Sequence, residues 1–292
     1  MIYQNTGELI ELLKRENLWA KKKLGQNFLI NPEALKNIVK AAEIQPEDEI
    51  VEIGPGLGIL TEQLSNSAKT VTSIELDQTI IPTLKRNLAK ATNSPEPEQK
   101  TLNGKIHNIH IIHQDALQYD PPAKSYKLVA NIPYYITSPI LNHFLEQQPA
   151  DKRPKLLILL VQKEVAQKIC VKTGDQTILS LEVQAFGKPS IVCNVGKNSF
   201  YPQPNVDSAV LKIETFAEPK ITDPEIFFKL IKGAFNQKRK KISNTIPSAL
   251  SLTSEQADQL FQNSHVPSDM RPQNISLDQW EALIQAYKKL TV

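Results

Sequence analysis

The sequence predicts an α/β fold in which a Rossmann-like, mainly parallel sheet is followed by a small C-terminal all-helical domain. Three observations carry this prediction. Short β-rich runs alternate with helical stretches between residue 46 and about residue 161, which is the pattern of strand–helix–strand units. A turn with three glycines follows the first run, and from Asp223 onward the apolar residues recur at helical spacing.

The strands are predicted from short apolar runs, which are typical of strands buried on both faces. These runs span residues 50–53, 70–74, 109–112, 127–130 and 156–161. Asp77 is expected to cap a helix that runs through Leu84 and Leu88. A further helix is expected near 140–146, and the polar, proline-containing segment 92–105 predicts a surface loop.

Two later strands, 190–195 and 208–213, are expected to pair antiparallel at the edge of the sheet. The periodicity then breaks near Pro219. We therefore predict three parts, which are an N-terminal extension (1–17), the sheet domain (18–218) and a helical domain (219–292).

The composition indicates a soluble, cytoplasmic protein with a sizeable core. Hydrophobic residues make up 40% of the 292 residues, yet the longest purely apolar run, 156–161, is far shorter than the ~20 residues that cross a bilayer. Residues 1–20 mix charged residues with leucines, which predicts an amphipathic helix or tail and no signal peptide.

Neither cysteines nor histidines predict a metal site. Cys170 and Cys193 have no CxxC spacing, and no carboxylate pattern completes a site around His107, His110 and His113. We therefore expect no metal ion.

The distribution of charge is more informative than the net charge of +3. Three lysines follow one another at positions 21–23, and the run 238–241 consists of Lys238, Arg239, Lys240 and Lys241. Either run alone is typical of a solvated surface, but two such runs can supply contacts to phosphates.

The segment 52–58 (Glu-Ile-Gly-Pro-Gly-Leu-Gly) predicts a small-molecule site at the carboxyl end of the first strand. A nicotinamide fingerprint would place its third glycine at position 59, where this chain has Ile59. Glu75, after the second strand, is placed to accept hydrogen bonds from two ribose hydroxyls, and Asp115, after the third, from an adenine amine. The pattern therefore favours S-adenosylmethionine over a dinucleotide.

The tetrapeptide Asn131-Ile132-Pro133-Tyr134 opens onto the same edge of the sheet. An adenine amine is a poor nucleophile because its lone pair is delocalised into the ring. The Asn131 side-chain oxygen and the Ile132 carbonyl can accept its two N–H bonds and stabilise the positive charge that develops on nitrogen during methyl transfer. Tyr134 offers a flat face to an unstacked base. Alone the tetrapeptide would be an ordinary turn, but its position favours methylation of an amine.

Together these motifs resemble the small-subunit ribosomal RNA adenine N6,N6-dimethyltransferases. The resemblance covers roughly residues 18–290 and includes the strings 23–29, 161–166, 200–202 and 234–240. It implies a class I methyltransferase sheet that binds S-adenosylmethionine. The implied cofactor ligands are Asn27, Leu29, Gly54, Glu75, Asp115 and Asn131. Phe200 would complete a base clamp opposite Tyr134.

The resemblance also implies a target, namely two adjacent adenosines in the loop of the 3′-terminal hairpin of small-subunit (16S) rRNA, methylated in a pre-30S particle by a monomeric enzyme. Residues 18–218 would form the catalytic domain, and 219–292, with the 238–241 run, would recognise RNA. One departure is Tyr135, where many members carry Asn. It leaves Asn131 and Tyr134 in place, so we expect an altered pocket wall and the same reaction.

Three alternatives remain open from the sequence. A large-subunit rRNA adenine methyltransferase of the antibiotic-resistance type would share the cofactor and amine motifs, although the string 235–241 and the helical C-terminal domain favour the small-subunit family. A non-catalytic assembly or transcription factor is disfavoured by the intact Glu75 and Asn131. A nicotinamide-dependent oxidoreductase is disfavoured by the shifted third glycine.

Overall fold

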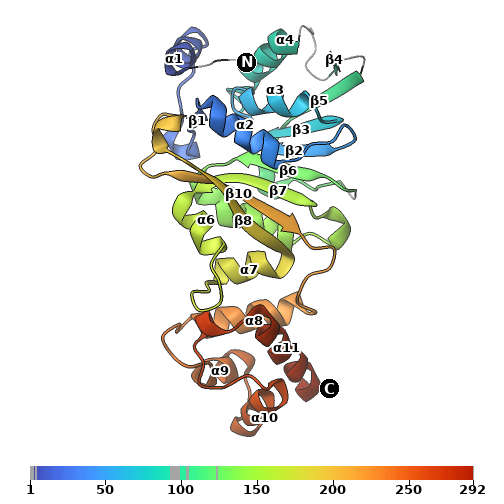
Figure 1. Cartoon of the computed structure of the whole chain (residues 1–292), viewed down its shortest axis with the longest axis vertical. Helices are drawn as coiled ribbons and strands as arrows, with labels where there is room; N and C mark the ends of the chain where they lie inside the picture. Colours follow the sequence, from blue (N-terminus) through green and yellow to red (C-terminus); the bar gives the residue numbers. More distant parts are fainter. Residues whose placement is uncertain (1–2, 4, 93–98, 103–104, 123, 292) are drawn as a thin grey trace. The chain divides into compact units, whose positions relative to one another are not determined.

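The computed structural model describes residues 3, 5–92, 99–102, 105–122 and 124–291. Within these residues, eight strands form one sheet in the order β4-β5-β3-β2-β6-β7-β10-β8 (Figure 1). The five predicted runs are β2 (Glu49–Ile53), β3 (Thr70–Glu75), β5 (Lys105–His113), β6 (Lys127–Asn131) and β7 (Leu156–Gln162). They pair in parallel, which confirms the α/β fold class.

Burial on both faces explains the composition of the central strands. In β7 every residue from Leu156 to Val161 is buried, because β7 lies between β6 and β10 and helices cover the sheet. Helix α2 (Pro32–Ala41) packs against β7 and β10 through apolar residues at helical spacing. The other helices that follow strands of the sheet are α3 (Ile59–Ser65), α4 (Ile81–Thr92), α5 (Thr137–Leu141) and α6 (Lys163–Ile169).

The later strands lie at one edge of the sheet, as predicted. β10 (Ser208–Thr215) pairs antiparallel with β7, and β8 (Gly187–Val195) lies beside β10. Between them along the chain, β9 (Phe200–Tyr201) pairs antiparallel with β1 (Phe28–Leu29). This short ladder joins the N-terminal segment to the proline-rich loop.

Two local predictions were wrong. Asp77 does not cap α4, which begins at Ile81; its carboxylate instead accepts a hydrogen bond from the Thr79 N–H at 3.0 Å, in the turn before the helix. Part of the predicted 92–105 loop forms β4 (Gln99–Leu102), which pairs antiparallel with β5. A polar strand can form there because an edge strand of an antiparallel pair needs no buried face. Residues 93–98 and 103–104 lie outside the described residues.

The expected helix near 140–146 is present, although it is divided. Helix α5 ends at Leu141, and a π-helical turn over Asn142–Glu146 continues it. The N-terminal extension contains α1 (Thr6–Arg15), whose apolar face, including Leu9 and Leu12, is buried, so the amphipathic helix is confirmed. No helix in the described parts of the chain is long and apolar enough to cross a membrane.

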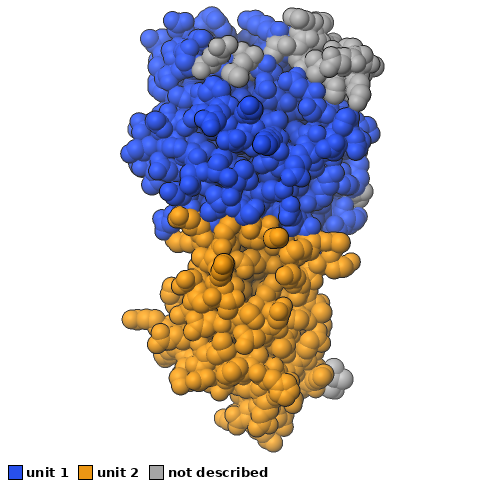
Figure 2. All heavy atoms as spheres, viewed as in Figure 1, with its two compact units in different colours: residues 1–166, 190–215 blue, residues 167–189, 216–292 orange. Residues whose placement is uncertain are grey.

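The chain divides into two compact units (Figure 2). Unit 1 comprises residues 1–166 and 190–215, and it contains the sheet except for the first three residues of β8. Unit 2 comprises 167–189 and 216–292, so α7 (Ile178–Phe186) and the first residues of β8 group with the C-terminal helices. The other helices of unit 2 are α8 (Pro224–Phe235), α9 (Ile246–Leu250), α10 (Ser254–Ser264) and α11 (Leu277–Thr291). α7 joins this unit because it packs against α8 and α11, with the Phe186 and Phe228 rings stacked at 6.4 Å.

Candidate active site

The carboxyl ends of the parallel strands surround a cavity of about 280 Å³ in unit 1. Every residue predicted to bind cofactor or base lines this cavity. These residues are Asn27, Leu29, Gly54, Glu75, Asp115, Asn131, Tyr134 and Phe200. They come from segments far apart in the sequence, and the sheet brings them to one edge.

The glycine turn after β2 lines the cavity. Gly54 and Gly56 have φ values of 70° and 56°, in the left-handed region that glycine tolerates best. A Cβ on Gly54 would lie 3.4 Å from the Asn131 carbonyl oxygen, and one on Gly56 would lie 3.4 Å from the Phe28 ring. These are ordinary van der Waals distances, so the positive φ values, and not a lack of space, favour glycine at both positions.

Glu75 ends β3 and is 6% exposed. Its Oε2 accepts a hydrogen bond from the Gly56 N–H at 3.2 Å, and its Oε1 accepts one from the Asp77 N–H at 2.8 Å. Burial raises the pKa of Glu75, and these backbone hydrogen bonds oppose the rise. Each carboxylate oxygen keeps a lone pair for a further donor, so the group is held in place without being saturated.

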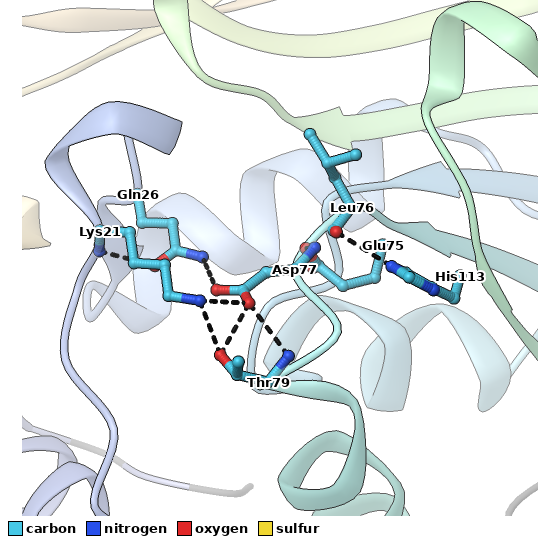
Figure 3. Close-up of polar contacts among 7 residues, drawn as sticks. All are labelled: Lys21, Gln26, Glu75, Leu76, Asp77, Thr79 and His113. Atoms are coloured by element: carbon cyan, nitrogen blue, oxygen red, sulfur yellow. Dashed lines mark hydrogen bonds and ion pairs between the residues drawn. The ribbon is translucent and has the colours of Figure 1, made fainter.

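Asp77 ties the N-terminal segment to the end of β3 (Figure 3). Its Oδ1 accepts from Lys21 Nζ at 2.6 Å, and its Oδ2 accepts from Gln26 Nε2 at 2.9 Å. Gln26 in turn accepts from the Lys21 N–H at 2.8 Å. Burial opposes ionisation of Asp77, but the hydrogen bonds, led by that of Lys21, lower its pKa to about 2. The segment beyond Lys21 is thus anchored as one wall of the cavity.

Asn131 and Tyr134 are both oriented by hydrogen bonds. Asn131 Nδ2 donates to the Asn27 carbonyl at 3.4 Å, and its Oδ1 has no partner among the described residues. The Tyr134 hydroxyl is 2.7 Å from Ser208 Oγ, and burial raises its pKa. The amide can therefore accept a hydrogen bond in the cavity, while the phenol ring is fixed at its far end.

The β1–β9 ladder contains Leu29 and Phe200, and Asn27 directly precedes β1. Leu29 is paired with Phe200 in the ladder, and both are buried. Asn27 Nδ2 donates to the Gly25 carbonyl at 3.1 Å. Phe200 is only 3% exposed and belongs to the hydrophobic core, so one part of its ring packs internally while it lines the cavity.

Asp115 follows β5, and its Oδ1 accepts from the Leu117 N–H at 2.9 Å. Leu76, which is 49% exposed, lines the same cavity beside Glu75. An exposed aliphatic side chain next to two acids gives a site with an apolar surface and polar edges, as a flat heterocycle with an exocyclic amine requires.

Comparison with known proteins identifies the family. Residues 17–289 match the ribosomal RNA adenine dimethylase family. The chain belongs to this family. A relative named ribosomal RNA small subunit methyltransferase A, from Dehalococcoides mccartyi, is 35% identical over 285 residues, which cover 95% of this chain and 91% of the relative. The protein of that name from Latilactobacillus sakei is 41% identical over 250 residues, covering 81% of this chain and 78% of the relative.

Two solved methyltransferase structures have the same fold. A dimethyladenosine transferase from Plasmodium falciparum matches with a TM-score of 0.74 and 26% identity, covering 91% of this chain and 98% of that one. The 23S rRNA methyltransferase ErmE matches with a TM-score of 0.67 and 25% identity, covering 90% and 100%. One of the two is a 23S rRNA methyltransferase by name although the relatives above are small-subunit methyltransferases by name, so the fold alone does not select the substrate of this dimethylase.

Sequence reasoning missed two features of the dimethylase site. Tyr3 lies in the N-terminal extension, outside the family match, yet it is 2% exposed and lines the cavity. The sequence places Lys21 in a basic cluster with Lys22 and Lys23, but in the structure Lys21 forms an ion pair with Asp77. No local pattern could have found either contact, because each joins residues that are distant in the sequence.

The 238–241 run lies in unit 2, after α8, and all four of its residues are exposed.

Glu52 is a buried acid beneath the glycine turn of the dimethylase. Its Oε2 accepts from Thr61 Oγ1 at 2.6 Å and Ser73 Oγ at 2.7 Å, while its Oε1 has no partner among the described residues. Burial raises the pKa of Glu52 to about 7, and the two hydroxyl donors offset only part of that effect.

Replacing Glu52 with Gln is expected to remove a pH dependence of stability. The unfolded carboxyl releases its proton near pH 4.5 and the folded one near pH 7, so the native state binds more protons between these values. The free energy of unfolding of the wild type should therefore fall by about 3 kcal/mol as pH rises through this window, and Glu52→Gln should flatten the fall. Urea unfolding at pH 4.5 and pH 8 measures it, with the exposed Glu47→Gln as control. An unflattened profile in Glu52→Gln would mean that Glu52 stays ionised when buried.

Proposed function

We propose that this chain uses S-adenosylmethionine to methylate N6 of two adjacent adenosines in the 3′-terminal hairpin loop of small-subunit (16S) rRNA, giving N6,N6-dimethyladenosine in a pre-30S particle. The observation that carries the proposal is the placement of the Asn131 amide in the same cavity as Glu75 and Asp115. Methyl transfer from a nucleoside cofactor to a base amine requires an acceptor for the N–H bonds of the amine and acids that bind the nucleoside. The cavity brings both kinds of group to one edge of the sheet. The enzyme would act as a cytoplasmic monomer.

The residues of the cavity fit this cofactor. Glu75 would accept from the ribose hydroxyls, Asp115 from the adenine amine, and Leu76 would lie against the adenine face. The open backbone at Gly54 and the side chains of the segment 27–29 would hold the methionine end. When bound, the sulfonium supplies an electrophilic methyl group.

Replacing Glu75 with Ala is expected to weaken cofactor binding by about 2 kcal/mol or more, which is about 30-fold in affinity, because charge-assisted hydrogen bonds to two hydroxyls are lost. Calorimetry with S-adenosylhomocysteine measures the affinity without turnover. The exposed Glu47→Ala removes the same charge and should bind normally. Normal affinity in Glu75→Ala would mean that the carboxylate holds the turn at Gly56 and not the ribose.

The chain would promote transfer by holding the amine. Asn131 Oδ1 and the Ile132 carbonyl would accept the two N–H bonds of N6, which directs the nitrogen lone pair toward the methyl carbon. The bound cofactor would supply the methyl group and keep the electron pair of its C–S bond on sulfur, and the N6 proton, made acidic by the new N–C bond, would pass to water while the two oxygens hold the nitrogen. These fixed dipoles stabilise the positive charge on nitrogen, and no strong general base is needed. Tyr134 and Phe200 would hold the unstacked base.

A large-subunit adenosine is the second candidate substrate, because the ErmE structure shares the fold. The small subunit is favoured because the sequence relatives at 35–41% identity are small-subunit methyltransferases by name. Labelled S-adenosylmethionine, incubated with small or large subunits that lack these modifications and followed by nucleotide mapping, tests the choice. Label on the two hairpin adenosines supports the proposal, and label only on large-subunit RNA would refute it.

The 238–241 run, which belongs to unit 2, would contact RNA phosphates. Its four side chains are exposed and have no acidic partner among the described residues, so they are not explained as structural ion pairs. A single pocket cannot distinguish one hairpin from many rRNA loops, and recognition by backbone and shape is general for structured RNA.

Changing all four residues of the 238–241 run to Gln is expected to weaken binding to undermodified small subunits and to flatten its salt dependence, by roughly 0.7–0.9 in slope for each phosphate that is no longer neutralised. Cofactor affinity should stay the same. A control that removes the same charge at other exposed positions would change Lys36, Lys40, Lys229 and Lys289 to Gln. A wild-type salt slope in the 238–241 variant would show that the run is only a solvated surface.

A further inference from the structure

Exposed aromatic and basic side chains occur at Tyr135, which lines the cavity, and in the N-terminal segment that leads to the lining residues Leu24 and Gly25. Trp19 is 71% exposed and Tyr135 is 59% exposed, which is unusual for rings of this size. Lys22 and Lys23 are exposed as well and have no acidic partner among the described residues. We call Trp19, Lys22, Lys23 and Tyr135 the entrance surface.

The outward position of Trp19 is fixed by the residues around it. Leu18 and Ala20, on either side, pack against the hydrophobic core of unit 1. Two residues later Lys21 is anchored, with its Nζ 2.6 Å from Asp77 Oδ1 and 2.8 Å from Thr79 Oγ1 (Figure 3). Trp19 is therefore held on the surface by a folded segment and does not belong to a frayed terminus.

The entrance surface borders the cavity through Gly25. Leu24, Gly25 and Tyr135 all line the cavity. A Cβ on Gly25 would lie 2.9 Å from Pro133 Cβ and 3.3 Å from Tyr135 Cε1, so the absence of a side chain lets the N-terminal segment meet the Tyr135 ring. The 3₁₀ turn Lys22–Leu24 directly precedes this contact. Trp19 lies five residues before Leu24, at most about 18 Å away along an extended chain.

We propose that the entrance surface binds the single-stranded nucleotides that flank the methylated adenosine, with Trp19 and Tyr135 stacking on bases and Lys22 and Lys23 contacting phosphates. This inference rests on the proposed function. Aromatic rings bind unpaired bases without reading their identity, and lysines between them follow the backbone. Because Lys21 is committed to Asp77, only two of the three consecutive lysines would contribute to RNA binding.

Kinetics on undermodified small subunits test the energetic part of the proposal. Trp19→Ala should raise KM by roughly tenfold, since the stacking of one base is removed, while kcat and affinity for S-adenosylhomocysteine stay within twofold. Trp19→Phe should retain part of the binding. Lys22→Gln with Lys23→Gln should lower the salt slope of binding by roughly 1.4. Lys36→Gln with Lys40→Gln, on the exposed side of α2, removes the same charge and should leave the slope unchanged.

Crosslinking identifies the partner. A photoreactive phenylalanine analogue at position 19 should crosslink to rRNA beside the two adenosines. Crosslinking to a ribosomal protein, no crosslink, or an unchanged KM in Trp19→Ala would overturn the inference. If the wild type methylates no small-subunit adenosine, the proposed function itself fails, and that result is read from the wild type alone.

Discussion

Replacing Asn131 with Ala is expected to lower kcat for methyl transfer by about 10²–10³, while cofactor affinity changes by no more than several-fold. The hydrogen bond from Asn131 Nδ2 to the Asn27 carbonyl leaves Oδ1 as the acceptor in the cavity. That acceptor contributes most when positive charge develops on the amine nitrogen, so its loss should affect the transition state more than the ground state.

The control for Asn131 is the same truncation at Asn263, an exposed position on α10, which should leave turnover unchanged. Single-turnover transfer to undermodified small subunits separates chemistry from product release. A near-normal kcat in Asn131→Ala would remove this residue from the mechanism. A loss of S-adenosylhomocysteine affinity to match the loss in kcat would instead assign it to cofactor binding.

The sheet could be predicted because burial on both faces requires continuous apolar runs in its central strands. The run 156–161 is apolar at every position, since both faces of β7 are covered. The glycine turn and the acids after successive strands then located the cavity, because parallel strands end at a common edge. Gly54, Glu75, Asp115 and Asn131 were therefore predictable from their order along the chain, whereas Asn27, Leu29 and Phe200 were implied only by the family resemblance.

Contacts between distant segments were not predictable in this way. Asp77 has the sequence of a helix cap, but its carboxylate is used by Lys21 and Gln26, which lie more than 50 residues earlier. β4 has a polar sequence and pairs only at the sheet edge. The segment 167–189 belongs to unit 2 because its helix packs against other helices of that unit. The apolar periodicity of a helix shows which of its faces is buried, but not which element covers that face.

A buried carboxylate with two lysine partners connects the amino ends of the parallel strands, at the end of the sheet opposite the cavity. Asp48 precedes β2 and is 3% exposed. Its carboxylate accepts from Lys127 at 2.7 Å and from Lys155 at 2.5 Å, and these lysines belong to the starts of β6 and β7. Burial opposes ionisation of Asp48, but the hydrogen bonds from the two lysines outweigh it and lower the pKa. The ion pairs therefore connect the starts of β2, β6 and β7, and Gly54 and Asn131 lie at the far ends of β2 and β6.

Replacing Asp48 with Ala is expected to destabilise the fold by about 3–5 kcal/mol, because the buried Lys127 ammonium would lose its counter-charge. Neighbouring Glu49 is the matched control. It pairs at 2.6 Å with Lys124, whose side chain is 57% exposed, and solvent-accessible pairs contribute about 0–1 kcal/mol, so Glu49→Ala should have a much smaller effect than Asp48→Ala. Urea unfolding at pH 7 measures both variants.

The pH dependence of the Asp48 effect distinguishes charge pairing from packing. A carboxyl whose pKa is lowered by folding stabilises the native state above its unfolded pKa of about 3.8, and this contribution is lost as pH falls below that value. The difference between wild type and Asp48→Ala should therefore shrink in acid. Combining Asp48→Ala with Lys127→Met should recover part of the stability, since no buried charge then remains unpaired. A penalty that is constant with pH and unrelieved by Lys127→Met would mean that Asp48 acts through its hydrogen bond to the Gln45 N–H, at 2.7 Å, and not through charge.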